Sequence, residues 1–164
     1  MEQIDLQPFV SERDNVFQIT FAAAPIGMVL MDQDGHFLMA NPALLEMLGY
    51  TEAEFLALTV ADITHPDDIA ATHSLIELLY AGGLPGDRYQ QEKRYLHKHG
   101  SVMWGMLSVA LVRDANGNPI CSMGQLINTT ESKRNEMLQQ YRTLVLERLA
   151  TGAALEQILA LLVA

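Results

Sequence analysis

The alternation of apolar and polar positions predicts two groups of β-strands separated by helical segments. Apolar runs at 26–31 and 36–40 have strand length and flank the turn sequence Asp-Gln-Asp-Gly, which predicts a hairpin. Three further strand-length runs are joined by turn residues suited to antiparallel hairpins, at 87–98, 102–113 and 119–128. This order predicts an α+β domain in which a five-stranded antiparallel sheet carries short helices on one face.

The short helices between the strands are predicted from their capping residues. Asn41 followed by Pro42 opens one helix, and Thr51 with Glu54 three residues later forms a capping box for the next. The sequence His-Pro-Asp-Asp at 65–68 opens a longer helix, because the helix dipole favours two acids in the first turn. These three helices are expected to cover the sheet.

Helices are also predicted at both ends of the chain. Residues 12–23 place apolar side chains on one face, with Ser11 as N-cap, and Thr130 is expected to cap a long helix over 131–150. The apolar spacing of the second helix fits a helix packed on its own domain and a dimeric coiled coil equally well. The very apolar segment 151–164 is expected to begin a following module.

Composition and charge narrow the class of protein. The 164 residues, 49% of them hydrophobic, are enough for one domain with a core. The formal charge of −10 offers no basic patch, so no nucleic-acid partner and no membrane contact are expected. No apolar run has the length of a membrane span, and the single cysteine, Cys121, fits a reducing, cytoplasmic location. Motifs for phosphate loops, nucleophile elbows and zinc hydrolases are absent, so no catalytic residue is assigned.

A series of motifs between residues 17 and 134 resembles the PAS sensor domains. The residues that carry the resemblance are Asp32 and Gly35 in the first turn, Asn41, Gly49-Tyr50, the His65–Asp68 motif, and Lys98, Gly100, Ser101 and Trp104 in a later hairpin. One position departs from the family, which usually ends in Asp-Ile-Thr where this chain has Asn128-Thr129-Thr130. Asn128 keeps the hydrogen-bonding capacity of the aspartate but loses its charge.

The resemblance implies a division of the chain into four parts. These are an N-terminal helical cap (1–24), a PAS core (25–129), a signalling helix (130–150) and the start of a further module that resembles a GAF domain (151–164). PAS–GAF pairs are common in bacterial proteins ahead of cyclic-di-GMP synthases and phosphodiesterases, and in sensor kinases. The full-length protein is therefore expected to be one of these enzymes, and this segment its non-catalytic regulatory part.

The function that the resemblance implies is sensory. A ligand, redox or gas event in the pocket is expected to shift the sheet, and Asn128, Thr130 and Glu131 are expected to transmit the shift to an output domain in the same chain. The alternative is a ligand-free module for dimerisation or protein docking. A homodimer is expected because both faces of the strand at 102–112 are apolar; it could form through the N-terminal helix, the sheet or the C-terminal helix.

Haem b is the first cofactor candidate that the resemblance implies. Some PAS oxygen sensors hold haem iron through one histidine on the long helix, and His73 lies at a comparable position. Four methionines are candidates for lining the pocket: Met28, Met103, Met106 and Met123. The alternatives are a half-buried His73 bonded to water or backbone, and methionines that fill core gaps.

A non-covalent flavin, FAD or FMN, is the second candidate. The Asn-Cys-Arg motif of the covalent light sensors is absent, and Cys121 lies on a predicted strand. Leu126 occupies the position where those sensors have a glutamine, and alternation places Gln125 on the opposite face of the sheet. A pocket without any cofactor is the third alternative.

Overall fold

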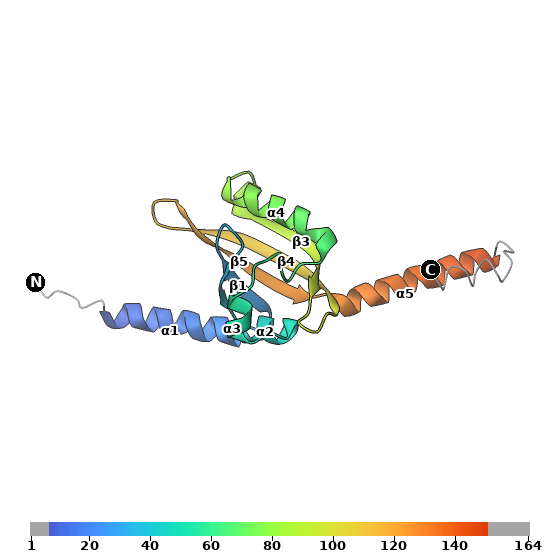
Figure 1. The fold of residues 1–164 in the computed structure, drawn as a ribbon, viewed down its shortest axis with the longest axis horizontal. Helices are drawn as coiled ribbons and strands as arrows, with labels where there is room; N and C mark the ends of the chain where they lie inside the picture. Colours follow the sequence, from blue (N-terminus) through green and yellow to red (C-terminus); the bar gives the residue numbers. More distant parts are fainter. Residues whose placement is uncertain (1–6, 151–164) are drawn as a thin grey trace, which may run out of the picture. The chain divides into compact units, whose positions relative to one another are not determined.

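The computed structural model describes the backbone of residues 7–150 and the side chains of residues 15–148 (Figure 1). The chain divides into two units between Asn128 and Thr129. The elements follow one another as α1 (Gln7–Ala23), β1 (Gly27–Met31), β2 (Phe37–Ala40), α2 (Pro42–Leu48), α3 (Glu52–Leu56), α4 (Pro66–Tyr80), the 3₁₀ helix η1 (Pro85–Asp87), β3 (Arg88–Leu96), β4 (Val102–Arg113), β5 (Pro119–Asn128) and α5 (Thr130–Ala150). The expected start of a further module at 151–164 lies outside the described residues.

The first unit is built on one five-stranded sheet in the order β2-β1-β5-β4-β3. All four neighbouring pairs are antiparallel, and β5 lies in the centre between β1 and β4. Helices α2, α3 and α4 contribute Leu48, Phe55 and Leu79, each fully buried, to the same core as the strands. The predicted α+β fold, with helices on one face of an antiparallel sheet, is therefore confirmed.

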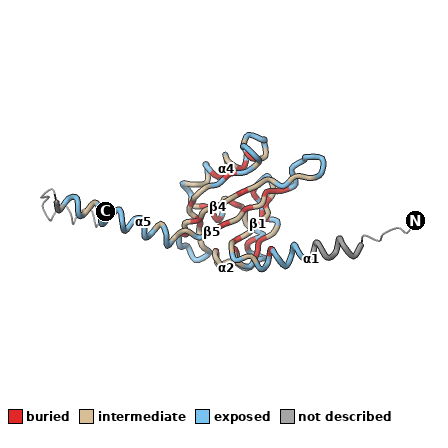
Figure 2. Tube along the Cα trace, turned by 180° about the vertical axis from the view of Figure 1, so that it is seen from behind, coloured by how far each residue is buried: buried red, intermediate tan, exposed pale blue. Residues whose placement is uncertain are grey.

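The two faces of the sheet differ in how well they are covered. Along β4 the buried positions alternate with half-buried ones: Leu107 and Val109 belong to the core, whereas Trp104 and Met106 lie on the other face. Figure 2 shows the buried residues concentrated on the strands. The apolar residues on one face of β4 are therefore covered by helices, and those on the other face are only half-buried.

The N-terminal helix is longer than the sequence predicts. It begins at Gln7, so Ser11, expected as its N-cap, lies inside the helix. Proline in the first turn, here Pro8, is compatible with this start because the N–H groups of a first turn have no partner within the helix. The apolar face expected on this helix, represented by Val16 and Ile19, is exposed, and within 15–23 Phe21 is the residue that is buried.

Asn41 connects the N-terminal helix, the first strand and the second helix. Its predicted capping role is confirmed, because its Oδ1 accepts a hydrogen bond from the backbone N–H of Leu44 at 3.0 Å. The same oxygen accepts from the N–H of Met28 at 2.8 Å. The side-chain amide donates to the carbonyl oxygens of Phe21 (3.1 Å), Ala24 (3.4 Å) and Ile26 (2.9 Å). A fully buried side chain thus makes five hydrogen bonds.

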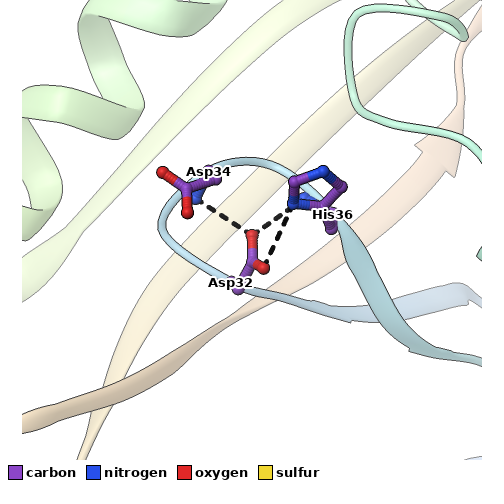
Figure 3. Close-up of side chains that lie close together, drawn as sticks. All are labelled: Asp32, Asp34 and His36. Carbon is purple, nitrogen blue, oxygen red and sulfur yellow. Dashed lines mark hydrogen bonds and ion pairs between the residues drawn. The ribbon is translucent and has the colours of Figure 1, made fainter.

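The turn between β1 and β2 brings Asp32, Asp34 and His36 together (Figure 3). Asp32 Oδ1 accepts from the backbone N–H groups of Asp34 and His36, both at 2.9 Å, and His36 Nδ1 lies 3.3 Å from Asp32 Oδ2. These bonds fix the turn, and Gly35 supplies its positive φ of 83°. The cluster is explained as a turn and not as a metal site.

The long helix α4 is tied to β3 at its first turn. Asp68 accepts two hydrogen bonds from the Arg94 guanidinium, at 3.0 and 2.7 Å, and one from the Arg94 backbone N–H at 2.9 Å. Hydrogen bonding with Arg94 lowers the pKa of Asp68 to about 2.

No helix in the described part of the chain has both the length and the apolar character of a membrane-spanning segment.

Candidate ligand-binding site

A cavity of about 30 Å³ lies in the core of the first unit, between the sheet and the helices. Apolar side chains from the strands and helices form most of its wall, and a few polar side chains complete it. The lining residues are Val29, Met31, Phe37, Leu44, Phe55, Val60, Ile63, Thr72, Tyr89, Lys93, Tyr95, Leu107, Gly124 and Leu126. Small-molecule sites are likewise lined mainly by apolar side chains, but their volumes are usually about 300–1,000 Å³.

Lys93 is the only lysine or arginine in this wall, and it is 1% exposed. Its Nζ donates hydrogen bonds to Thr64 Oγ1 at 2.9 Å and to Thr72 Oγ1 at 3.3 Å. The two threonine hydroxyls in turn donate to the carbonyl oxygens of Val60 (2.6 Å) and Asp68 (2.8 Å). Each threonine oxygen therefore accepts a hydrogen bond from the amine, and each threonine hydroxyl proton is donated to a backbone carbonyl.

Burial lowers the pKa of Lys93 from 10.5 to about 7, although the carboxylate of Asp68 acts in the opposite direction. Desolvation disfavours the charged ammonium, and no acidic side chain is hydrogen-bonded to it to restore that loss. Lys93 Nζ also lies 4.8 Å from the centre of the Tyr95 ring, a cation–π distance. Both protonation states of this amine are therefore accessible near neutral pH.

Two tyrosines on the same strand also belong to the residues around the cavity. Tyr89 and Tyr95 are 9% and 3% exposed, and neither hydroxyl has a hydrogen-bond partner. Burial raises the pKa of Tyr89 to about 12 and that of Tyr95 well above its ordinary value. Both phenols are therefore neutral and present a hydroxyl group with no acceptor.

The comparisons with known proteins agree with this architecture. The family model described as the PAS fold matches residues 37–125. The chain belongs to the PAS fold family. Over 131 residues it is 34% identical to the probable diguanylate cyclase DgcE of Escherichia coli (strain K12), a match that covers 80% of this chain and 12% of that protein.

Two further similarities are with sensor kinases. The chain is 34% identical over 116 residues to the sensor histidine kinase TmoS of Ectopseudomonas mendocina, covering 70% of this chain and 12% of that protein. A domain of a sensory box sensor histidine kinase/response regulator from Geobacter sulfurreducens superposes with a TM-score of 0.60 at 25% identity, covering 71% of this chain and 95% of that one. This PAS domain thus spans only a small part of the curated relatives that it matches.

The expected haem ligand, His73, lies on the exposed face of α4 and does not line the cavity of this PAS domain. The neighbouring residue Thr72 is the one that α4 presents to the cavity, because one residue turns a helix by about 100°. A volume of about 30 Å³ holds about two water molecules and is far smaller than a haem or a flavin ring system. The residues around the cavity therefore do not fit either cofactor in this structure.

The four methionines expected in the pocket also lie elsewhere. Met103 is buried in the core outside the cavity wall, while Met28, Met106 and Met123 are half-buried on the other face of the sheet. Met31 is the methionine that lines the cavity. Side chains alternate along a strand, so their face depends on the register of the sheet.

The alternation predicted for the last strand is confirmed. Leu126 lines the cavity, and its neighbour Gln125 lies in a groove on the opposite face of the sheet. Lys93, Tyr89 and Tyr95 are not among the residues that the sequence predicts for the pocket. The sequence of β3 is polar at both sets of alternate positions, so it carries no signal that would assign these side chains to the core face.

Proposed function

We propose that this PAS domain is the sensory region of a larger signalling protein, in which a change in the cavity moves the strand that leads to α5. The observation that carries the proposal is the position of Leu126, which lines the cavity and lies two residues before the end of β5 at Asn128. Helix α5 begins at Thr130, directly after that strand. Asn128, Thr130 and Glu131 therefore take the transmitting role, with no catalysis in the domain itself.

The pairing of the strands explains how the cavity and the end of β5 are coupled. Leu126 lies opposite Leu107, which also lines the cavity, and Asn128 lies opposite Gly105 on the same strand. A Cβ atom at Gly105 would approach Leu126 Cδ1 to 2.6 Å, so this part of the sheet has little spare volume. A ligand that favours one packing of Leu107 and Leu126 would therefore shift the last residues of β5.

The relatives support two kinds of output for the whole protein. Their names describe a probable diguanylate cyclase and a sensor histidine kinase. The output domain in this proposal is accordingly a module that makes or degrades cyclic-di-GMP, or a kinase. The proposal also places this PAS domain in the cytoplasm. The ligand-free docking module remains the alternative, and it predicts that the cavity and α5 are independent.

Replacing Leu107 with alanine is expected to change the amide chemical shifts of residues 129–133, because it loosens the contact with Leu126 on the cavity side. ¹H–¹⁵N correlation spectra of the folded variants measure this directly. Met106→Ala is the matched control, since Met106 is the neighbouring residue on the opposite face of β4. Shifts at 129–133 that stay unchanged in Leu107→Ala, or change equally in both variants, would reject the coupling.

A homodimer belongs to the same proposal, with α1 as the contact. Val16 and Ile19 are 62% and 60% exposed, which leaves an apolar helix face uncovered in the monomer. Light scattering coupled to gel filtration is expected to give the mass of a dimer, and Ile19→Glu the mass of a monomer. Gln18→Glu, an equal change at an exposed neighbouring position, should stay dimeric. A dimer that survives Ile19→Glu would place the contact on the sheet or on α5.

A further inference from the structure

The side chain of Lys93 connects three parts of the core. From strand β3 it donates hydrogen bonds to Thr64, in the loop before α4, and to Thr72 on α4, and its Nζ lies over the ring of Tyr95. Both threonine hydroxyls donate their own protons to backbone carbonyls, so they can only accept from Lys93. The two threonine oxygens therefore match the two N–H groups of a neutral amine.

The ammonium form of Lys93 has a third N–H group, and the described residues offer it no further hydrogen-bond acceptor. Its remaining partner is the Tyr95 ring, whose centre lies 4.8 Å from Nζ. The face of an aromatic ring attracts a cation, and the attraction is lost when the amine is neutral. The proton thus changes the interaction between Lys93 and Tyr95, while both threonine contacts are possible in either state.

The register of the sheet places this pair beside the end of β5. Lys93 is paired with Gly105 on β4, and Gly105 is paired with Asn128, the last residue of β5. A Cβ atom at Gly105 would lie 2.6 Å from Leu126 Cδ1 and 3.0 Å from Tyr95 Cε2. The Tyr95 ring and the Leu126 side chain therefore share the space that the glycine leaves, and a movement of the ring changes the packing of Leu126.

We propose that uptake of a proton by Lys93 is the event that this domain senses, and that Tyr95 and Leu126 relay it to the last residues of β5. This inference rests on the proposed function, because it names the signal that acts on the same core. Protonated Lys93 attracts the Tyr95 ring, and neutral Lys93 releases it toward Leu126. The two states differ in a defined contact, as a shift between two populations requires.

The surroundings of Lys93 contain one charged group that acts on it, the carboxylate of Asp68 on α4. This carboxylate favours the ammonium, but it accepts three hydrogen bonds from Arg94 and none from Lys93. On β3 itself, Tyr89 and Tyr95 stay neutral because burial raises their pKa values. The residues that the other strands, α2 and α3 contribute to the cavity wall are apolar or glycine, so they do not titrate.

The switch operates around neutral pH. Burial lowers the pKa of Lys93 to about 7, so its protonated fraction rises from about 10% at pH 8 to about 90% at pH 6. Histidine side chains change charge in the same range. The chain contains five histidines, and His65 follows Thr64 directly. A variant that removes Lys93 and keeps all five histidines therefore separates the two sources of a pH response.

A chain labelled with ¹³C at the lysine Cε atoms, titrated between about pH 6 and about pH 8 and followed by NMR, tests the switch. One lysine resonance is expected to titrate with its midpoint at about pH 7 and to be absent from Lys93→Met. The amide shifts of residues 126–128 are expected to change with the same midpoint. That change is expected to be lost in Lys93→Met, whose histidines are intact.

Two substitutions of Tyr95 test the relay. In Tyr95→Leu the pH-dependent change at 126–128 is expected to be lost with the ring, while Lys93 still titrates. Tyr95→Phe is the matched variant and keeps the change, because it removes only a hydroxyl without a hydrogen-bond partner. Lys98→Met is the control for the loss of a lysine and keeps both titrations, since Lys98 pairs with Glu54 on the surface.

Three results would overturn the switch: a Lys93 resonance without a midpoint between about pH 6 and about pH 8, shifts at 126–128 that do not follow it, or a change there that persists in Lys93→Met. A change that survives Tyr95→Leu would reject the relay through the ring. The proposed function is judged separately by the amide shifts at 129–133. If Leu107→Ala moves those shifts but Lys93 does not titrate, the sensing route stands and the signal is wrong. If Lys93 and residues 126–128 titrate together but Leu107→Ala has no effect at 129–133, the switch stands and the route to α5 is wrong.

Discussion

Replacing Asn41 with alanine is expected to lower the free energy of unfolding by about 3–4 kcal/mol. The alanine removes five hydrogen bonds at a fully buried position. It leaves the carbonyl oxygens of Phe21 and Ile26, and the N–H of Met28, without their side-chain partner. It also removes the N-cap of α2, a contribution of about 1 kcal/mol in itself. Urea unfolding followed by circular dichroism measures the loss.

Two further variants separate the role of Asn41 from a general effect of losing an asparagine. Asn41→Asp keeps the acceptor for the N–H groups of Met28 and Leu44 but cannot donate to the three carbonyls, so it is expected to be destabilised to a similar degree. Asn118→Ala removes an exposed asparagine that bonds only within its turn and should cost less than about 1 kcal/mol. A loss below about 1 kcal/mol in Asn41→Ala would contradict the structural role assigned to it.

The local signals of the sequence predict most of the fold because turns and caps depend on neighbouring residues alone. The capping box of Thr51 and Glu54 forms as expected, with Glu54 N bonded to Thr51 Oγ1 and Thr51 N bonded to Glu54 Oε2. The β4 strand has the bounds that its apolar run predicts. The sequence predicts too late a start for α1, because Ser11 is a good N-cap in isolation, while Pro8 allows the helix to begin earlier.

The candidate site was only partly predictable because it depends on which face of each element turns inward. A rotation by one residue separates the buried Thr72 from the exposed His73, and both belong to the same helical pattern. On β3 both faces are polar, so the sequence alone does not show that Lys93 faces the core. A charged residue is expected at the surface, and only the pairing of β3 with β4 and the packing of α4 reverse that expectation.

Replacing Lys93 with methionine is expected to raise the free energy of unfolding by about 1–4 kcal/mol at pH 7, because a buried charge without a counter-ion gives way to an apolar side chain of similar length. Thr64 and Thr72 tolerate the change, since their hydroxyl protons are bonded to the carbonyl oxygens of Val60 and Asp68. Urea unfolding of both proteins gives the difference. A methionine variant that is less stable than the wild type would show that the ammonium stabilises the fold.

The pH dependence of that difference identifies its cause. The unfolded chain holds the Lys93 proton up to about pH 10.5, whereas the folded chain releases it near pH 7. Between these values the unfolded state binds more protons, so the stability of the wild type rises with pH relative to Lys93→Met. The advantage of the methionine variant is therefore greatest at and below pH 7 and shrinks toward pH 10. If the stability difference between the two proteins stays constant between about pH 6 and pH 9, the gain comes from packing and not from removing a desolvated amine.

Lys98→Met is the control for removing an exposed lysine. It breaks a surface ion pair with Glu54, and its free energy of unfolding is expected to fall by up to about 1 kcal/mol.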